Sequence, residues 1–360
     1  MGKLLDDTHF RGASLKRIPL VVLGFGKVGQ ALATLLAERD GFVEEGVRIT
    51  LVAACDRSGG VMGDDLSIAD VIAAKRTGSG LRSVGGSGRA DLRPSEALSR
   101  YPEAILVDAS PTDPSSGEPG LSAIRHALQA GHSTVLASKG PLVVAFAELR
   151  ELAERNRCRI GMSAAVGTPL PVLELGHVGL RGSELHAFRG IFNTAANRIL
   201  ARMESGLTYE DAKKDAERAG VLESDPRLDV EGWDTAFKIL ILARSFWSPS
   251  IAMDSLTVQG IEGITQDTIA RAQESGGRVR LVGAARREPS GELTLQVRVE
   301  TLMPSDPLHA LTPDEKGVEL ETTLMGRLFV RTGKSGPEAT AAALVKDILN
   351  IAAHPAVLAV

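Results

Sequence analysis

A glycine motif near the start of the chain constrains the fold more than any other feature. Residues 20–23 form a short apolar run, and Gly24, Gly26 and Gly29 follow it in the spacing G-x-G-x-x-G. The alanine- and leucine-rich residues after the motif predict a helix. In such a strand-turn-helix unit the first glycine permits a tight turn, the second a close approach by a ligand, and the third packing of helix on strand. The motif therefore predicts a Rossmann-type doubly wound parallel sheet, an α/β fold.

The same motif predicts a dinucleotide-binding site. The N-terminus of a helix offers free N–H groups and a positive dipole end to a pyrophosphate. We therefore expect the cofactor to contact Gly24, Gly26, Lys27, Val28 and Gly29. A glycine turn with a purely structural role is the alternative reading of this motif.

The second apolar run, residues 47–55, ends at Asp56 and Arg57, where a residue that reads the ribose is expected. An acid there accepts a hydrogen bond from the 2′-OH of NAD, and an arginine favours the 2′-phosphate of NADP. Because the sequence presents both, it predicts NAD or NADP without choosing between them. For Arg57, a solvated loop position is an equally good interpretation.

Two later apolar runs, 104–109 and 133–137, predict further strands of the same sheet. Open α/β sheets bind ligands beyond the carboxyl ends of their strands. This rule makes Ser110 and Ser138 candidate cofactor ligands, and it makes Lys139 a candidate for contact with the nicotinamide or an acidic substrate. Most loop lysines are simply solvated, which is the alternative for Lys139. Residues 58–92, rich in glycine, serine and aspartate, predict a long connection with one helical segment near 66–75.

After about residue 166 the pattern of alternating strands and helices fades. A strand at 184–191 is followed by helices at 192–203 and 209–219, and five later runs with turn residues between them predict an open, mostly antiparallel sheet. We expect an N-terminal arm (1–17), a dinucleotide-binding domain (18–165) to which 336–360 returns through a helix at 337–351, and an α+β catalytic and dimerisation domain (166–335). The exposed edge of such a sheet needs a partner, which favours a homodimer.

Acidic residues concentrate in the stretch 219–247. A loop held out of helix by Pro226 carries Glu223 and leads to Asp229, and a helix predicted from about residue 230 carries Asp234 and Lys238. Residues four apart share a helix face, so these two side chains should be neighbours. The simplest interpretation is that Asp234 and Lys238 form an ion pair on the helix surface. The apolar run after Lys238 favours partial burial instead, and a partly buried lysine can donate or accept a proton in catalysis.

Composition excludes several classes of protein. The formal net charge of -4 argues against a general nucleic-acid binder. No apolar run reaches the roughly 18 residues that a membrane span needs, and the first 17 residues do not resemble a secretory signal. The two cysteines, Cys55 and Cys158, follow apolar runs and are expected to be buried thiols rather than a disulfide or metal ligands. These features predict a cytoplasmic protein.

Together these residues resemble the homoserine dehydrogenase family. The most specific match is a Glu-x-Asp-Pro loop followed by Asp-Val-x-Gly-x-Asp-x-x-x-Lys, which here begins at Glu223 and ends at Lys238. The glycine motif, the Ser-Lys-Gly-Pro turn at 138–141, the segment 259–261 and the C-terminal run 336–341 also resemble the family. The resemblance covers nearly the whole chain from about residue 18.

The resemblance implies an NAD(P)-linked interconversion of L-homoserine and L-aspartate 4-semialdehyde by a dimeric enzyme without a catalytic metal. It implies that Glu223 holds the substrate amino group, Asp234 orients the reacting hydroxyl, and Lys238 exchanges a proton with its oxygen. Lys139 would lie near the cofactor ring and the substrate. Asp229, Asn193 and Thr194 complete the substrate-binding set.

Two segments depart from the family pattern. The usual Asn-Gly-Thr-Thr-Asn substrate turn reads Asn-Thr-Ala-Ala-Asn at 193–197, and Ser163 replaces an acid with which some members hold a monovalent cation. One alternative is therefore a related dehydrogenase that acts on another small hydroxy or amino acid. A second is a nucleotide-binding protein without turnover, which the presence of Glu223, Lys139, Asp234 and Lys238 disfavours.

Overall fold

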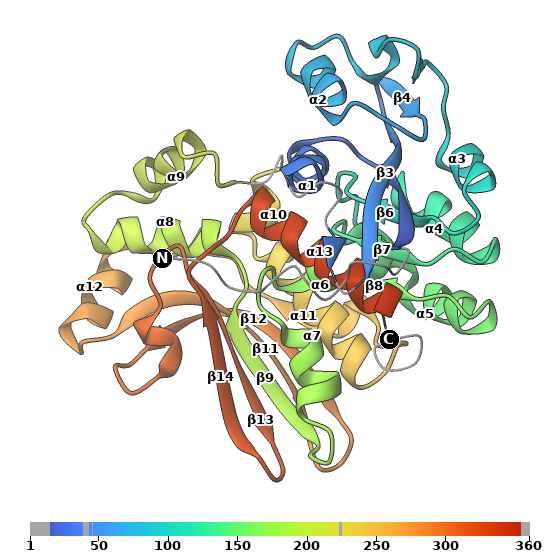
Figure 1. Ribbon diagram of the computed structural model, residues 1–360. Helices are drawn as coiled ribbons and strands as arrows, with labels where there is room; N and C mark the ends of the chain where they lie inside the picture. Colours follow the sequence, from blue (N-terminus) through green and yellow to red (C-terminus); the bar gives the residue numbers. More distant parts are fainter. Residues whose placement is uncertain (1–14, 39–42, 45, 223–224, 354–360) are drawn as a thin grey trace, which may run out of the picture.

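Two sheets lie side by side, each with helices packed on it (Figure 1). The computed structural model describes residues 15–38, 43–44, 46–222 and 225–353. Sheet A is built mainly from the first half of the chain and sheet B from the second half. Helix α11 (Trp233–Phe246) packs against both halves, and most of its residues are buried.

Sheet A has a parallel centre in which the first parallel strand, β1, lies between the second, β3, and the third, β6. Its order is β5-β4-β3-β1-β6-β7-β8, with β2 beside β3. This reversal of strand order at β1 is the place where doubly wound sheets bind their ligands. The parallel strands are β1 (Lys16–Leu23), β3 (Val47–Asp56), β6 (Ile105–Asp108), β7 (Thr134–Leu136) and β8 (Ile160–Gly161). The antiparallel ones are β2 (Val43–Glu44), β4 (Gly59–Met62) and β5 (Gly88–Arg89).

Helices cover both faces of sheet A because its central strand is apolar on both sides. Leu20 and Val22 of β1 pack in one cluster with α1 (Lys27–Glu38) and α13 (Pro337–Ala353). Val21 and Leu23 pack in the other cluster, with α3 (Pro94–Arg100), α4 (Gly120–Gln129) and α5 (Gly140–Arg155). The predicted doubly wound fold is confirmed, and the last helix does pack on this sheet.

Sheet B has the order β10-β12-β11-β9-β13-β14. Its neighbouring strands are antiparallel except for β10 and β12, which are parallel. The strands are β9 (Leu185–Ile191), β10 (Leu256–Val258), β11 (Arg278–Arg287), β12 (Leu293–Leu302), β13 (Lys316–Thr322) and β14 (Gly326–Thr332). The mostly antiparallel second sheet is therefore confirmed.

Helices α8 (Thr194–Glu204) and α11 pack on sheet B, and α9 (Tyr209–Arg218) and α12 (Gln266–Glu274) pack against α8. Arg244 of α11 is buried and donates hydrogen bonds to the carbonyls of Leu142 and Val143 in α5, at 2.9 and 2.8 Å. The two halves are thereby joined by hydrogen bonds as well as by apolar packing. The remaining short helices are α2 (Ile68–Arg76), α6 (Ser163–Val166), α7 (Val172–Glu174) and α10 (Arg227–Val230), with single helical turns at Leu81–Ser83, Leu175–Gly179, Met253–Ser255 and Pro307–Ala310.

Several predicted boundaries were wrong. The connection 58–92 contains β4 and β5 as well as the predicted helix. These strands were missed because they contain glycines, which let strand backbones pack closely but do not give the alternating apolar pattern of a strand. The first of the five later runs that predicted strands, 256–264, forms a strand only as far as Val258. Pro226 does not keep the following residues out of helix, because it caps α10, and Gly232 with φ +87° separates α10 from α11. Helices α3, α5 and α12 were not predicted.

Cys55 and Cys158 are buried free thiols, as predicted. In the part of the chain that the structure describes, no helix has both the length and the apolar character needed to cross a membrane.

Candidate active site

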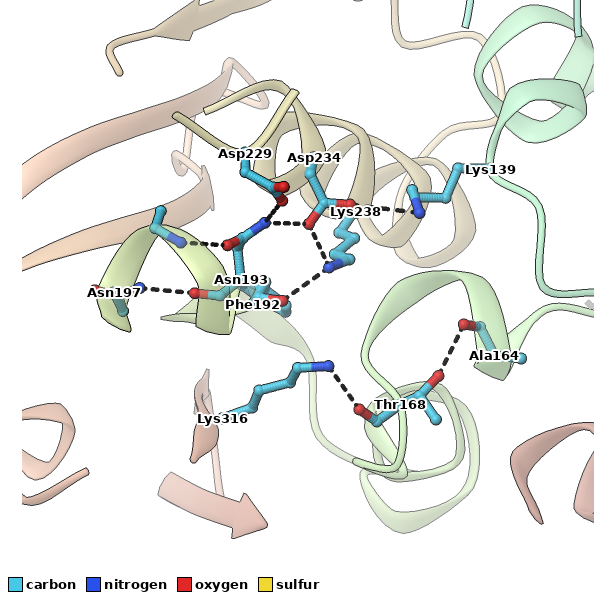
Figure 2. Close-up of polar contacts among 11 residues, drawn as sticks. Lys139, Ala164, Thr168, Phe192, Asn193, Asn197, Asp229, Asp234, Lys238 and Lys316 are labelled. Atoms are coloured by element: carbon cyan, nitrogen blue, oxygen red, sulfur yellow. Dashed lines mark hydrogen bonds and ion pairs between the residues drawn. The ribbon is translucent and has the colours of Figure 1, made fainter. Parts of the chain in front are cut away.

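Asp234 and Lys238 form the ion pair that their spacing predicts, and it is a buried one. Lys238 Nζ lies 2.6 Å from Asp234 Oδ2. The Asp234 side chain is 4% exposed and that of Lys238 is 12% exposed. Lys238 also donates to the backbone carbonyl of Phe192, at 2.8 Å. These two acceptors fix the position of the ammonium group, and Figure 2 shows it reaching from α11 toward the start of α8.

Lys139 reaches the same carboxylate from sheet A. It precedes α5, directly after β7, and its Nζ lies 3.4 Å from Asp234 Oδ1 (Figure 2). Burial by itself raises the pKa of Asp234. The Lys238 and Lys139 ammonium groups lower the pKa by more than burial raises it, so the pKa lies well below its ordinary value. Asp234 is therefore a buried carboxylate shared by two lysines, one on α11 and one in the turn between β7 and α5.

Asn193 connects this carboxylate to a second one. Its Nδ2 donates to Asp234 Oδ2 at 2.7 Å and to Asp229 Oδ1 at 2.6 Å, and all three side chains are buried. Its Oδ1 accepts from the backbone N–H of Ala196, which caps α8. Asn193 thus sets the start of α8 and the spacing of the two acids, and Thr194 is the first residue of that helix.

The glycine motif has the geometry that dinucleotide binding requires. Gly24 has φ +90°, and a Cβ there would lie 2.4 Å from the Ala109 carbonyl oxygen. A Cβ on Gly29 would lie 2.4 Å from the Gly24 carbonyl oxygen, whereas one on Gly26 would meet nothing within 4 Å. The first and third glycines are needed for packing, and the second leaves open space before α1, which begins at Lys27 and Val28.

Asp56, at the end of β3, is held by its neighbours. Its Oδ1 accepts from the N–H and hydroxyl of Ser58, at 2.7 and 2.5 Å, and its Oδ2 lies 2.5 Å from Lys75 Nζ. Burial raises its pKa, but the hydrogen bonds from Lys75 and Ser58 lower it more, so Asp56 is a carboxylate. Arg57 is exposed. Lys75 was missed, because only the fold brings α2 to the end of β3.

The ends of β6 and β7 bring the predicted Ser110 and Ser138 to the same edge of sheet A. Both serines are buried, and the Ser110 hydroxyl has no hydrogen-bond partner among the described residues. The backbone N–H groups of Ala137 and Ser138 donate to the carbonyl of Asp108, at 2.8 and 3.4 Å. An orphaned hydroxyl and an open glycine turn at one sheet edge fit a polar ligand such as a dinucleotide.

Asp108 is a buried acid that sequence analysis did not single out, and it supports a pH prediction. Burial raises its pKa to about 6, although the Ser110 N–H donates to Oδ1 at 3.0 Å. Because the pKa of Asp108 is higher in the folded protein than in the unfolded one, its contribution to stability is full below the unfolded pKa of about 3.9. That contribution is lost as pH rises through 6 and the buried carboxyl ionises. Asp108→Asn should therefore gain stability relative to the parent between about pH 4 and pH 6, by up to about 3 kcal/mol, and keep that gain above pH 6.

Urea denaturation of the cofactor-free protein from pH 4.5 to 8 measures this difference. Asp91→Asn is the matched control, because Asp91 is an exposed acid of the same half of the chain. A difference between Asp108→Asn and the parent that does not change with pH would contradict the prediction.

Ser163 lies in a polar cluster with Glu174, Lys346 and Asp347. Its hydroxyl donates to Asp347 Oδ1 at 2.7 Å and to Glu174, and it accepts from Lys346 Nζ at 2.9 Å. Lys346 also pairs with Glu174. Burial raises the pKa of Asp347 to about 6. The acids around Ser163 thus have the lysine of α13 as a cationic neighbour. Glu223, predicted as a substrate ligand, lies outside the described residues.

Comparison with known proteins gives a consistent result. Residues 171–349 match the model of the family described as homoserine dehydrogenase. The NAD(+)-dependent homoserine dehydrogenase of Pseudomonas canavaninivorans is 32% identical over 339 residues, which are 92% of this chain and 95% of that protein. The homoserine dehydrogenase of Methanocaldococcus jannaschii is 29% identical over 335 residues, which are 92% and 98% of the two chains.

Solved structures agree with these relatives. A putative homoserine dehydrogenase from Archaeoglobus fulgidus superposes with a TM-score of 0.79 at 31% identity, covering 93% of this chain and 99% of that one. A hyperthermophilic archaeal homoserine dehydrogenase in complex with NADPH has a TM-score of 0.79 at 25% identity, over 93% and 97% of the two chains. The fold, the grouped lysines and carboxylates, and these relatives agree: the chain belongs to the homoserine dehydrogenase family.

Proposed function

We propose that this protein is an NAD(P)-dependent homoserine dehydrogenase, an oxidoreductase that interconverts L-homoserine and L-aspartate 4-semialdehyde. One observation carries the proposal. Lys139, at the ligand-binding edge of sheet A, and Lys238, in the second half of the chain, share the buried carboxylate of Asp234. A substrate beside this group would lie next to a nicotinamide held by the glycine turn. The relatives do not favour the alternative of a different hydroxy-acid substrate.

In the proposed mechanism Lys238 is the proton donor and acceptor. The substrate oxygen gains negative charge when the aldehyde is reduced, so a positioned ammonium group beside it stabilises the transition state. Asp234 holds Lys238 in place and orients the hydroxyl end of the substrate. Lys139 adds a second positive charge on the cofactor side. The nicotinamide supplies or accepts the hydride.

The acids near Asn193 would hold the substrate ammonium group. Asp229 is buried, and Asn193 keeps it beside Asp234. We assign Glu223 the same role on the basis of the family pattern. Thr194, at the start of α8, would contact the substrate from the other side of Asn193. A positively charged amino group relieves the repulsion among these carboxylates when it binds.

The cofactor would lie over the glycine turn. Gly24, Gly26, Lys27, Val28 and Gly29 would bind the pyrophosphate through the N-terminus of α1. Asp56 and Arg57 would contact the adenosine ribose, and Ser110, Ser138 and Lys139 would contact the nicotinamide half. Initial rates with L-homoserine and either NAD or NADP at alkaline pH test the proposal. Cofactor binding without turnover of L-homoserine would refute it.

Asp56→Ala tests which residue selects the cofactor. The change removes a carboxylate acceptor for the 2′-OH of NAD and leaves Lys75 beside the position of a 2′-phosphate. We expect the ratio of kcat/KM for NAD to that for NADP to fall at least about tenfold, as loss of a charge-assisted hydrogen bond predicts. Arg57→Ala is the matched variant at the neighbouring position. It should raise the ratio of kcat/KM for NAD to that for NADP. An unchanged ratio in Asp56→Ala would remove Asp56 from the ribose site.

We further propose a homodimer formed through sheet B, and a division into an arm (1–17), a dinucleotide-binding domain (18–165 with 336–360) and a catalytic and dimerisation domain (166–335). Edge strand β14 and its hairpin carry exposed apolar side chains, with Leu324 80%, Met325 47% and Phe329 37% exposed. Exposed apolar edges of this kind pair with partners. Sedimentation velocity would test the dimer. A cytoplasmic location stays a prediction.

A further inference from the structure

Arg244 is a buried cation of α11 whose partners among the described residues are all backbone carbonyls. Its Nη1 donates to the carbonyls of Leu142 and Val143, at 2.9 and 2.8 Å, and its Nε donates to the carbonyl of Ile251 at 2.9 Å. No carboxylate in that part of the chain forms an ion pair with it. Buried charges are usually paired, because an unpaired charge is costly to remove from water. An arginine kept here at that cost points to a role that an apolar side chain cannot fill.

The two carbonyls of α5 that bind Arg244 lie at a kink. Ala145 has φ −135° and ψ 30°, which is not helical, although the residues on both sides of it belong to α5. In a regular helix, the carbonyls of Leu142 and Val143 accept from the N–H groups four residues later, on the far side of Ala145. A side chain that inserts into this ladder of hydrogen bonds is a known cause of a helix kink. The Arg244 guanidinium therefore holds the first turn of α5, residues 140–143, in the direction that the kink gives it.

Val143 connects this guanidinium to Lys139. Its carbonyl accepts from Arg244, and its own N–H donates to the carbonyl of Lys139 at 2.9 Å. Lys139 immediately precedes α5, and its ammonium group lies 3.4 Å from Asp234 Oδ1 (Figure 2). Helix α11 thus contacts the start of α5 at two points, through Asp234 in its first turn and Arg244 in its last.

The direction of the first turn of α5 matters because the charge of Lys139 acts over distance. Its ammonium group is one of the two cations that lower the pKa of Asp234. The effect of a cation on a carboxylate or on a substrate oxygen weakens as the two move apart. Without Arg244, the carbonyls at the kink are free to form regular helical hydrogen bonds, which would straighten α5 and move Lys139. A shift of about 1 Å in a group beside the reaction can lower the rate about a hundredfold.

We propose that Arg244 is a positioning residue for the reaction, because it holds the kinked start of α5 and thereby sets Lys139 beside Asp234 in the active site. This inference rests on the proposed function. It gives the two ends of α11 linked tasks: the first turn carries Asp234, and the last turn places the lysine that reaches Asp234 from α5.

The test is a double-mutant cycle with Arg244→Met, Lys139→Met and the variant that carries both changes. The measured quantity is kcat/KM for oxidation of L-homoserine at saturating cofactor. Arg244→Met should lower kcat/KM at least about tenfold in the parent, because it moves Lys139. In the Lys139→Met background the same change should alter kcat/KM less than about twofold, since no ammonium group is left to misplace. Equal losses in the two backgrounds would mean that Arg244 does not act through Lys139, and would overturn the inference.

Arg155→Met is the matched control, because it removes an exposed arginine from the other end of α5, and it should leave kcat/KM unchanged. Arg244→Lys keeps a cation without the planar guanidinium, so its loss of kcat/KM should lie between those of the parent and Arg244→Met. If Arg244→Met does not fold, Arg244→Lys takes its place in the cycle. A loss of equal size in both backgrounds, or no loss at all, then overturns the inference. Failure of the parent protein to oxidise L-homoserine would refute the proposed function itself, and is seen before any variant is compared.

Discussion

Lys238→Met is expected to lower kcat at least about a hundredfold, the scale of lost general acid–base help. Methionine keeps the apolar stem of lysine in its largely buried position but has no proton to exchange. The ammonium group it removes is the one that Asp234 and the Phe192 carbonyl hold at 2.6 and 2.8 Å. Because Lys139 still pairs with Asp234, the carboxylate keeps a cation after the change.

The measurement is single-turnover oxidation of L-homoserine at saturating cofactor, together with titration of NADH or NADPH binding by fluorescence. Cofactor affinity should be unchanged, since the glycine turn lies in sheet A. Lys214→Met, on the exposed side of α9, is a control for loss of a surface lysine. Turnover within a few-fold of the parent would remove Lys238 from the proton-transfer role.

Local sequence patterns predicted the parts of the site that lie close together in the chain. The four-residue spacing of Asp234 and Lys238 predicted their shared helix face, and the structure confirms their contact. The glycine spacing likewise predicted the turn between β1 and α1, because its steric demands are met within that one unit. In both cases the geometry depends on a few consecutive residues.

Contacts between distant segments could not be predicted in this way. Lys139 meets Asp234 because α5 and α11 pack together, and nothing in either local pattern encodes that packing. Lys75 reaches Asp56 only after α2 folds back over the end of β3. Short polar strands such as β4 were missed because glycine replaces the apolar alternation that identifies a strand.

The position of Asp234 between two lysines predicts that Asp234→Asn will destabilise the fold strongly. The change keeps the size of the side chain but leaves Lys139 and Lys238 close together without the carboxylate that they share. Breaking a buried ion pair by removing one partner costs about 3–5 kcal/mol. Turnover should fall as well, because Lys238 loses the group that orients it.

Urea denaturation of the cofactor-free protein measures this cost, and the two tryptophans, Trp233 and Trp247, report unfolding from the two ends of α11. Asp267→Asn is the matched control, because Asp267 and Arg271 form an ion pair with the same spacing on the exposed face of α12, where such a pair contributes about 0.5 kcal/mol.

The folded-state pKa of Asp234 is lowered, so its contribution is present above the unfolded pKa of about 3.9 and is lost as pH falls below it. The difference between Asp234→Asn and the parent should therefore be full at pH 7 and shrink in acid. Equal and small losses for Asp234→Asn and Asp267→Asn would mean that the buried carboxylate does not hold the two lysines together.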